Sequence, residues 1–349
     1  MKRAKSVGVI LLVGVVVIAG GWWMRQRRAT PRAAAPDARR YQGLITIGTE
    51  TWTGYLPLYV ARDRGYFRDE GLQVAIKRYI ALGQLSKDYV AGAMQGRANL
   101  TLDMVNEALQ GLDHKAILAI DYSNGSDAIV ARQEVSGLAA LRGKRVAYEP
   151  NTLEEFFIAW ALKEVGLSLA DLQSVSANPE DAAKQLADGR LDVAVSHEPF
   201  LSQMLQSKQF HVLYSSANAP GLITDVLTFR TDFLQAHPET AQALVRAYFK
   251  ALRFWREHPD DAHRILAKEF GDTPEGIAKQ LEGIKMLDEA DNNTAFTFAA
   301  GLQSLYGNLR QIGAFVLNHQ GGPARTLDTD QLIERRFVKQ LIKSETPAP

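Results

Sequence analysis

The feature that most constrains this chain is an alternation of β-rich and helix-like segments along most of its 349 residues. Several β-rich runs are nearly continuous in apolar residues, which is typical of strands covered on both faces in a parallel sheet. Strand–helix alternation of this kind indicates a doubly wound α/β fold. The predicted strands are Leu44–Gly48, Gln73–Ile80, Asn99–Asp103, Lys115–Asp121, Ala128–Arg132, Arg145–Glu149, Leu172–Ala177, Val193–Glu198, Phe210–Ser215 and Val226–Arg230.

Two helices between these strands have recognisable starts. Thr152-x-x-Glu155 matches a capping box, in which both side chains would bond backbone amides of the first turn. Asn178-Pro179 places a capping residue before a proline at the first helical position, and Gly189 is expected to end that helix.

Two further patterns concern the domain organisation. Segments 96–100 and 189–193 share a Gly-Arg pair that leads into a strand, which favours two lobes of similar build. From about Thr231 the chain becomes helical, and apolar residues at three- and four-residue spacing over 243–255 predict a wide buried face.

The N-terminus carries an uncharged run of 18 residues, 7–24, flanked by Lys and Arg on both sides. As a helix it would span about 27 Å, close to the hydrocarbon core of a bilayer. Trp22 and Trp23 lie where an interfacial aromatic belt would be. Residues 1–24 are therefore interpreted as a signal anchor, or as a signal peptide cleaved after the small residues 19–21. Residues 25–43, rich in Ala, Pro and Arg, would form a flexible tether.

Composition excludes several functional classes. Lys and Arg number 40 against 39 Asp and Glu, whereas a nucleic-acid binder would normally present a strongly basic face. The chain has no Cys, which removes disulfides, Cys-ligated zinc, iron–sulfur clusters, an N-terminal lipidated cysteine and a thiol nucleophile. No cofactor or metal is expected.

Several motifs together resemble the nitrate/taurine/sulfonate-type substrate-binding proteins of ABC importers. The resemblance covers roughly residues 44–310. It rests on Trp52-Thr-Gly54-Tyr55-Leu-Pro57-Leu58-Tyr-Val-Ala61, Gly65-Tyr66-Phe67, Glu70-Gly71-Leu72-x-Val74, Leu138-x-x-Leu141-Arg-Gly143-Lys144-Arg-Val146-Ala147, Glu198-Pro199 and Pro238-Glu239. The order and spacing of these motifs carry the match, since each alone is only moderately specific.

The resemblance implies a type II periplasmic-binding-protein fold, in which two α/β lobes close on a ligand. Lobe 1 would comprise 44–123 and 224–349, the latter with the C-terminal helices, and lobe 2 would comprise 126–221. Two crossovers would lie near Asp121–Asp127 and Pro220–Asp225. Hinge closure of this kind is a two-state change biased by ligand contacts.

Acidic residues stand at the carboxyl ends of the predicted strands, where open α/β sheets bind ligands. They are Glu50, Asp103, Asp121, Glu149 and Glu198, with Asp225 added at the second crossover. A carboxylate-rich cleft suits a cation or an amine, and it suits nitrate or a sulfonate poorly.

Four other residues are candidates for ligand contact. Trp52 and Tyr55 would supply aromatic faces, and Gln84 follows the second strand. Thr152 would cap its helix and could turn its hydroxyl to the cleft, while free amides at that helix start would favour an anion. An anion and a neutral polar molecule therefore remain alternatives for the ligand.

No enzyme motif is present. The seven histidines form no HExxH pair, and the sequence has neither a G-x-S-x-G elbow nor a Walker A loop. The related thiamine-precursor synthases depend on a cysteine-rich motif that this chain lacks. LysR-type regulators share the fold but begin with a DNA-binding helix-turn-helix, whereas this chain begins with an apolar run.

We therefore expect a solute-binding component that delivers a small polar molecule to an ABC permease and its ATPase subunit. It would lie at the periplasmic face of the inner membrane, tethered through residues 1–24, or be soluble in the periplasm if that segment is cleaved. The alternative is a membrane-tethered sensor that binds a similar molecule without transport.

Overall fold

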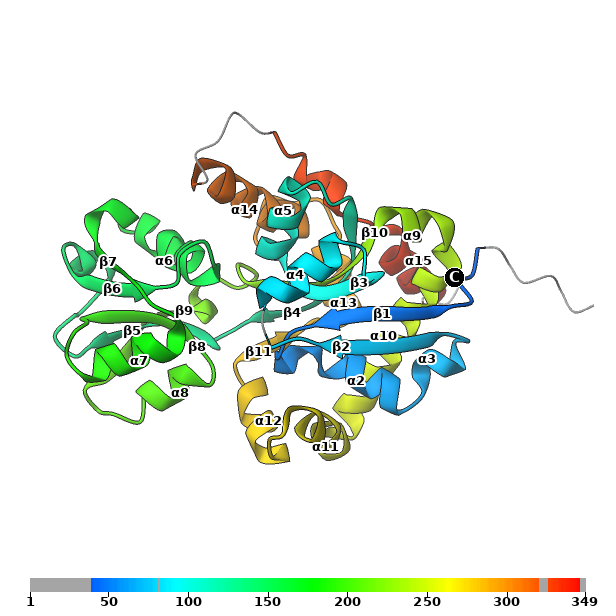
Figure 1. Ribbon diagram of the computed structural model, residues 1–349, viewed down its shortest axis with the longest axis horizontal. Helices are drawn as coiled ribbons and strands as arrows, with labels where there is room; N and C mark the ends of the chain where they lie inside the picture. Colours follow the sequence, from blue (N-terminus) through cyan, green and yellow to red (C-terminus); the bar gives the residue numbers. More distant parts are fainter. Residues whose placement is uncertain (1–38, 81, 320–325, 346–349) are drawn as a thin grey trace, which may run out of the picture.

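The computed structural model describes residues 39–80, 82–319 and 326–345. The predicted membrane segment 1–24 lies outside these residues, as does most of the predicted tether. Within the described ranges no helix combines the length and apolarity that a membrane crossing requires. The chain forms two lobes side by side, each built on one sheet with helices packed around it (Figure 1).

Lobe 1 is built on a six-stranded sheet in the order β11-β4-β10-β3-β1-β2. Strand β1 pairs in parallel with both β2 and β3, whereas β10 runs antiparallel between β3 and β4. The strands are β1 (Leu44–Thr49), β2 (Gln73–Arg78), β3 (Gly96–Leu100), β4 (His114–Ser123), β10 (Thr224–Arg230) and β11 (Ile284–Met286).

Lobe 2 is built on a five-stranded sheet in the order β7-β6-β8-β5-β9. Strand β6 is parallel to β7 and β8, and β5 is antiparallel to β8 and β9. The strands are β5 (Asp127–Arg132), β6 (Arg145–Tyr148), β7 (Gln173–Ser176), β8 (Val193–His197) and β9 (Phe210–Ser215). Both sheets are thus mixed. Burial on both faces was predicted correctly for β4, β5, β8 and β10, but burial does not distinguish a parallel neighbour from an antiparallel one.

The helices cover both faces of each sheet (Figure 1). Those of lobe 1 are α2 (Leu56–Asp63), α3 (Tyr66–Asp69), α4 (Leu82–Val90), α5 (Thr101–Leu109), α9 (Thr231–Ala236), α10 (Pro238–Glu257), α11 (Pro259–Phe270), α12 (Pro274–Leu281), α13 (Glu289–Ala295), α14 (Leu305–His319) and α15 (Arg336–Glu345), and those of lobe 2 are α6 (Leu153–Lys163), α7 (Pro179–Ala187) and α8 (Phe200–Met204). The predicted apolar face of 243–255 lies on α10, where it packs into the core of lobe 1 with Trp255 only partly buried.

Three of the predictions concern the strand end at Asp103 and the two helix starts, and two of these three were wrong. The strand predicted over Asn99–Asp103 ends at Leu100, where extended backbone gives way to α5, so Asp103 lies in the first turn of a helix. Thr152 does precede α6, but it makes no side-chain capping bond, and the Glu155 carboxylate accepts from the Asn151 amide instead. The third boundary was correct, since Asn178 caps α7 by accepting from the Asp181 amide and Pro179 follows it.

The chain crosses between the lobes at 124–126 and again at 216–223, and the two crossings are hydrogen-bonded to each other. The Ser123 amide donates to the Ile223 carbonyl at 2.9 Å. The buried Ser216 hydroxyl lies 2.7 Å from the Ser123 hydroxyl and accepts from the Gly125 amide, also at 2.7 Å. Ser216 therefore ties both crossings together at one point.

Replacing Ser216 with Ala should lower the free energy of unfolding by about 1–3 kcal/mol, because the Gly125 amide and the Ser123 hydroxyl would lose a buried partner. Urea unfolding followed by circular dichroism measures the change. Ser136, which is exposed in lobe 2, provides the control, and S136A should stay within about 0.5 kcal/mol of the parent. Equal stability of S216A and the parent protein would show that this tie contributes nothing.

Candidate functional site

Four carboxyl groups of lobe 1 come together where its sheet faces lobe 2. Glu50 follows β1, and Asp103 lies in the first turn of α5. Asp121 and Asp225 are direct partners in the antiparallel register of β4 and β10. Both are almost fully buried, at 0% and 2% exposure. Like charges directly opposite on neighbouring strands destabilise a sheet, so this pair needs a proton or a cation near it.

Trp52 and Tyr55 hold these carboxyl groups in place. The Trp52 indole N–H lies 3.3 Å from both oxygens of Asp121. The Tyr55 hydroxyl donates to Asp225 Oδ1 at 2.5 Å and lies 3.2 Å from Glu50 Oε1. Tyr55 is fully buried, so its ring belongs to the core and offers the cleft no aromatic face. Trp52 is only partly buried, and its ring can serve that role.

Gly54, between these two aromatics, explains why the motif has a glycine there. A Cβ atom at Gly54 would collide with the Asp121 carboxylate and with the Trp52 indole nitrogen. The missing side chain lets the loop approach Asp121 closely. The Trp52-Thr-Gly54-Tyr55 motif thus places the Trp52 indole N–H beside the buried Asp121 carboxylate.

Burial is the main cause of the raised pKa values of these carboxyl groups. It raises the pKa of Asp121 to about 8, with Asp127 and Glu50 adding repulsion against the Trp52 hydrogen bond. It raises the pKa of Glu50 to about 7, helped by the neighbouring Asp103. The pKa of Asp225 is also raised, first by burial and then by Asp121. Near neutral pH the cluster therefore holds protons that a bound cation would displace.

Lobe 2 adds more acidic groups from the opposite side. Asp127 begins β5, and its pKa is raised by burial and by the carboxylates of Glu154 and Glu198. Glu154, in the first turn of α6, also raises the pKa of Asp103 across the gap between the lobes. His197, at the end of β8, lies near carboxyl groups of both lobes, since its interaction partly opposes the burial that raises the pKa of Asp127 and of Glu50.

Arg97 is the cation that the sequence reasoning missed. It is 1% exposed on β3, pairs with Glu107, and lies 3.2 Å from Asp103. Behind it, burial raises the pKa of Glu107 to about 7 and lowers that of His114 to about 4. Arg97 therefore offsets the negative charge of Asp103 and Glu107. It stands at the start of its strand, so a search of strand ends could not find it.

The remaining predicted residues lie in other settings. Glu149 is exposed, and Gln84 is exposed with its amide donating to Asp88. The Glu198 carboxylate accepts hydrogen bonds from the hydroxyl and the amide of Ser202. Because Ser202 lies in the first turn of α8, Glu198 satisfies a free amide at the start of that helix. In the part of the chain that the structure describes, none of these three predicted side chains makes a hydrogen bond to Asp121 or Asp225, whereas Glu198 adds to the raised pKa of the buried Asp127.

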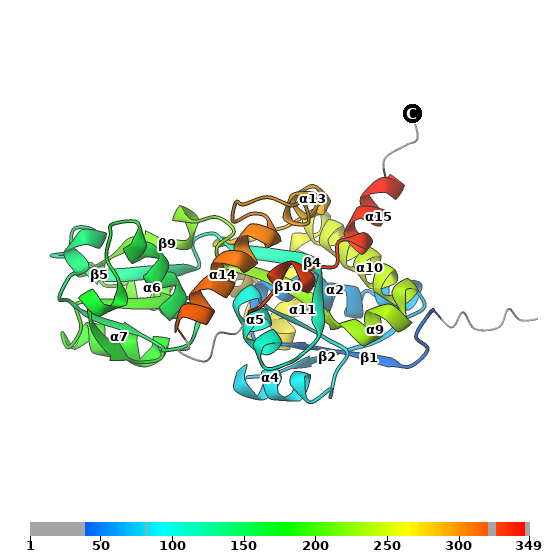
Figure 2. The same ribbon diagram turned by 90° about the horizontal axis from the view of Figure 1, so that it is seen from above.

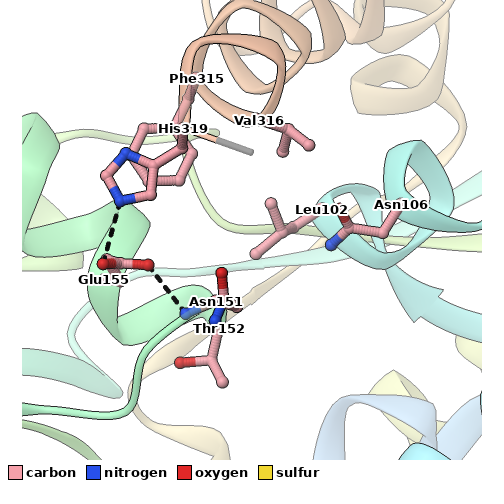
Figure 3. Close-up of a pocket in the computed structure, with 8 residues that line it drawn as sticks. All are labelled: Leu102, Asn106, Asn151, Thr152, Glu155, Phe315, Val316 and His319. Atoms are coloured by element: carbon pink, nitrogen blue, oxygen red, sulfur yellow. Dashed lines mark hydrogen bonds and ion pairs between the residues drawn. The ribbon is translucent and has the colours of Figure 1, made fainter. Parts of the chain in front are cut away.

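Thr152 lines a small cavity between α5, α6 and α14. Its hydroxyl donates to the Glu149 carbonyl at 2.7 Å and to the Glu154 carboxylate. The lining of the cavity comes from both lobes and includes none of the four carboxyl groups of the cluster (Figure 3). Its lining residues are Leu102, Asn106, Asn151, Thr152, Glu155, Phe315, Val316 and His319. Among the residues placed in the structure, no group of His, Asp or Glu is arranged to hold a metal ion.

Comparison with known proteins agrees with the fold. The family model described as "NMT1/THI5 like" matches residues 52–262. The taurine-binding periplasmic protein of Escherichia coli K12 is 24% identical over 310 residues, which cover 84% of this chain and 93% of that protein.

Solved structures give the same result. The periplasmic aliphatic sulphonate-binding protein SsuA from Escherichia coli superposes with a TM-score of 0.68 at 17% identity, covering 84% of this chain and 92% of that one. The desulfurization enzyme DSZB superposes with a TM-score of 0.59 at 13% identity, covering 86% of this chain and 100% of that one. The two-lobed periplasmic-binding-protein fold is confirmed, and the same fold carries both binding proteins and an enzyme.

The raised pKa of Asp121 predicts how stability depends on pH in the absence of ligand. Between the unfolded pKa of about 3.8 and the folded value of about 8, the unfolded chain releases a proton that the folded chain keeps. The stabilising contribution of this proton is complete below about pH 4 and is lost as pH rises through 8. In Asp121→Asn this loss is absent.

Urea unfolding of both proteins at pH 5 and pH 8 measures the effect. From pH 5 to pH 8 the free energy of unfolding of the parent should fall by at least about 1.4 kcal/mol more than that of D121N. This difference corresponds to one pKa unit. Asp188, exposed at the end of α7, provides the control variant D188N, which should follow the parent. Parallel profiles for the parent and D121N would contradict the raised pKa.

Proposed function

The chain belongs to the NMT1/THI5-like family, and on that premise we propose that it is the extracytoplasmic solute-binding component of an ABC importer. It captures a small polar molecule between its lobes and delivers it to a permease. No reaction is performed on the molecule, and the energy for transport comes from the ATPase subunit. The single observation that carries the ligand site is the buried carboxyl cluster between the two lobes.

The bound molecule carries a cationic or amine group. Asp121, Asp225 and Glu50 offer acceptors for charge-assisted hydrogen bonds, and the partly buried Trp52 ring can face a cation. Asp103 contributes a fourth carboxylate that Arg97 holds toward the cleft. The other predicted contacts, Gln84, Glu149, Thr152 and Glu198, would lie farther out, along the rim.

Magnitudes decide between this class and an anion. Each carboxyl group of the cluster that is ionised costs a sulfonate 4–5 Å away about 3–4 kcal/mol at an effective dielectric constant of 20, whereas it stabilises an ammonium group by a similar amount. A helix N-terminus offers an anion only about 0.3–1 kcal/mol, and up to about 2 in favourable cases. The uncapped start of α6 at Thr152 is the feature that favours an anion, as do the names of the relatives. A zwitterion with an ammonium group satisfies both features.

The partners and the location follow from the same proposal. Residues 1–24 anchor the protein in the inner membrane with its lobes in the periplasm, or are cleaved to release it. A permease and an ATPase would complete the importer. A tethered sensor would use the same cleft without these partners, and a neighbouring permease gene would favour transport.

The first experiment is a thermal-shift screen of the purified protein against small amines, guanidino compounds, pyrimidines, taurine, alkyl sulfonates and nitrate. A ligand that binds only the folded state stabilises it by about 2.7 kcal/mol at a hundred times its dissociation constant. A shift with amines or guanidino compounds supports the cationic class. A shift with nitrate or alkyl sulfonates alone would contradict it and leave the family assignment intact.

The variant Asp121→Asn tests the role of charge with any amine that binds. It should weaken that amine at least about tenfold, or 1.4 kcal/mol, and should change binding of a neutral analogue much less. Isothermal titration of both compounds measures the difference, with D188N as the matched control. Equal losses for the amine and the neutral analogue would mean that Asp121 acts through the fold alone.

A further inference from the structure

Helix α14 is anchored in lobe 1 at the second crossing. The fully buried Asn308 amide donates to the Gly221 and Leu222 carbonyls at 2.7 and 2.9 Å. Arg310 pairs with Asp330 at 2.6 Å, which fixes the helix to the following 3₁₀ turn of Thr329–Leu332. The first half of α14 therefore moves with lobe 1 and with the hinge.

The last turn of α14 contacts lobe 2. His319 Nε2 lies 3.0 Å from Glu155 Oε1 on α6, and the Glu155 side chain is only 8% exposed. Phe315 stacks on His319 and also meets Phe156 of α6, with ring centroids 5.0 Å apart. Figure 2 shows α14 running from the middle of the molecule toward α6, and Figure 3 shows His319 and Phe315 above Glu155.

Apolar packing continues through the same contact. Ile312 and Val316 of α14 belong to one hydrophobic cluster with Leu102 of α5 and with Phe156 and Phe157 of α6. On α5, Leu102 and Asn106 line the cavity beneath α14, while Asp103 and Glu107 face Arg97. Residues four apart share a helix face, so α5 serves the α14 contact and the carboxyl cluster from different sides. The contact with α14 is thus separate from the carboxyl cluster.

We propose that the last turn of α14 is a strap that holds lobe 2 closed, and that Phe315 and His319 are positioning residues for ligand capture although they stand outside the carboxyl cluster. Rotation of lobe 2 about the two crossings would have to separate His319 from Glu155 and Phe315 from Phe156. The strap raises the closed fraction of the ligand-free protein. Since apparent affinity scales with the fraction of competent molecules, it raises affinity for whichever ligand binds. The inference concerns closure itself and holds for a transporter component or a sensor.

Energy transfer between two labels on the full chain in mild detergent tests the strap without a ligand. The sequence has no Cys, so K87C on α4 and A187C on α7, both exposed, are the only thiols in the labelled protein. The two helices belong to different lobes (Figure 1). Opening would lengthen the distance between them.

His319→Ala should lower the closed fraction at least threefold, seen as a shift of the single-molecule population toward lower transfer. Phe315→Leu, which keeps an apolar side chain but loses the ring contacts, should shift it in the same direction. Gln311, exposed on the same helix, provides the control Q311A, which should leave the distribution unchanged.

The His319 side chain is 38% exposed, so H319A is expected to fold normally, and a thermal melt checks this. Unchanged transfer in both H319A and F315L would overturn the strap. A shift of Q311A as large as that of H319A would overturn it too. Failure of every compound in the ligand screen would count against the carboxyl cluster and would leave this result standing.

Discussion

The arrangement of the cleft depends on two carboxyl groups, Asp121 and Asp225, that face each other from neighbouring strands. These strands, β4 and β10, are also the ones that carry the chain to and from lobe 2. A hydroxyl and an indole N–H stabilise the pair, but neither supplies a positive charge. The centre of the molecule therefore keeps an electrostatic cost that only protons or a bound cation relieve.

The same fold serves relatives named for taurine and sulfonates, so the fold leaves the charge of the ligand open. In this chain the charge around the proposed ligand site comes from single residues at the ends of strands and the starts of helices. Arg97 compensates the rear of the cluster by engaging Glu107 and Asp103. The front pair of Asp121 and Asp225 has aromatic hydrogen-bond donors instead of such a cation. A cationic group would therefore be most stabilised beside Asp121 and Asp225, which have no protein cation next to them, among the described residues, to offset their charge.

The sequence predicted most strand positions because burial on both faces leaves a continuous apolar signal. It did not predict strand direction, since β4, β5 and β10, which pair antiparallel, are as buried as β6, which pairs in parallel with both of its neighbours. The strand-end rule placed Glu50 and Asp121 together, and the predicted second crossover added Asp225, which pairs with Asp121 in the register of β4 and β10. The aromatic face expected of Tyr55 is absent because its ring is buried, and an aromatic residue in a loop gives no sign of whether its ring or only its hydroxyl is accessible. The strand-end rule also missed Arg97 and Asp127, which stand where strands begin.

Two interactions between the lobes act on closure in opposite directions. Glu154 and Asp127 of lobe 2 add to the effect of burial in raising the pKa of Asp103 and Asp121 of lobe 1, so repulsion between their ionised forms opposes the closed state. The α14 contacts with α6 oppose opening. A ligand that neutralises the carboxyl groups removes this repulsion and leaves the α14 contacts with α6 in place. Because the α14 contacts already favour the closed form, the ligand needs a smaller differential affinity to shift the population toward that form.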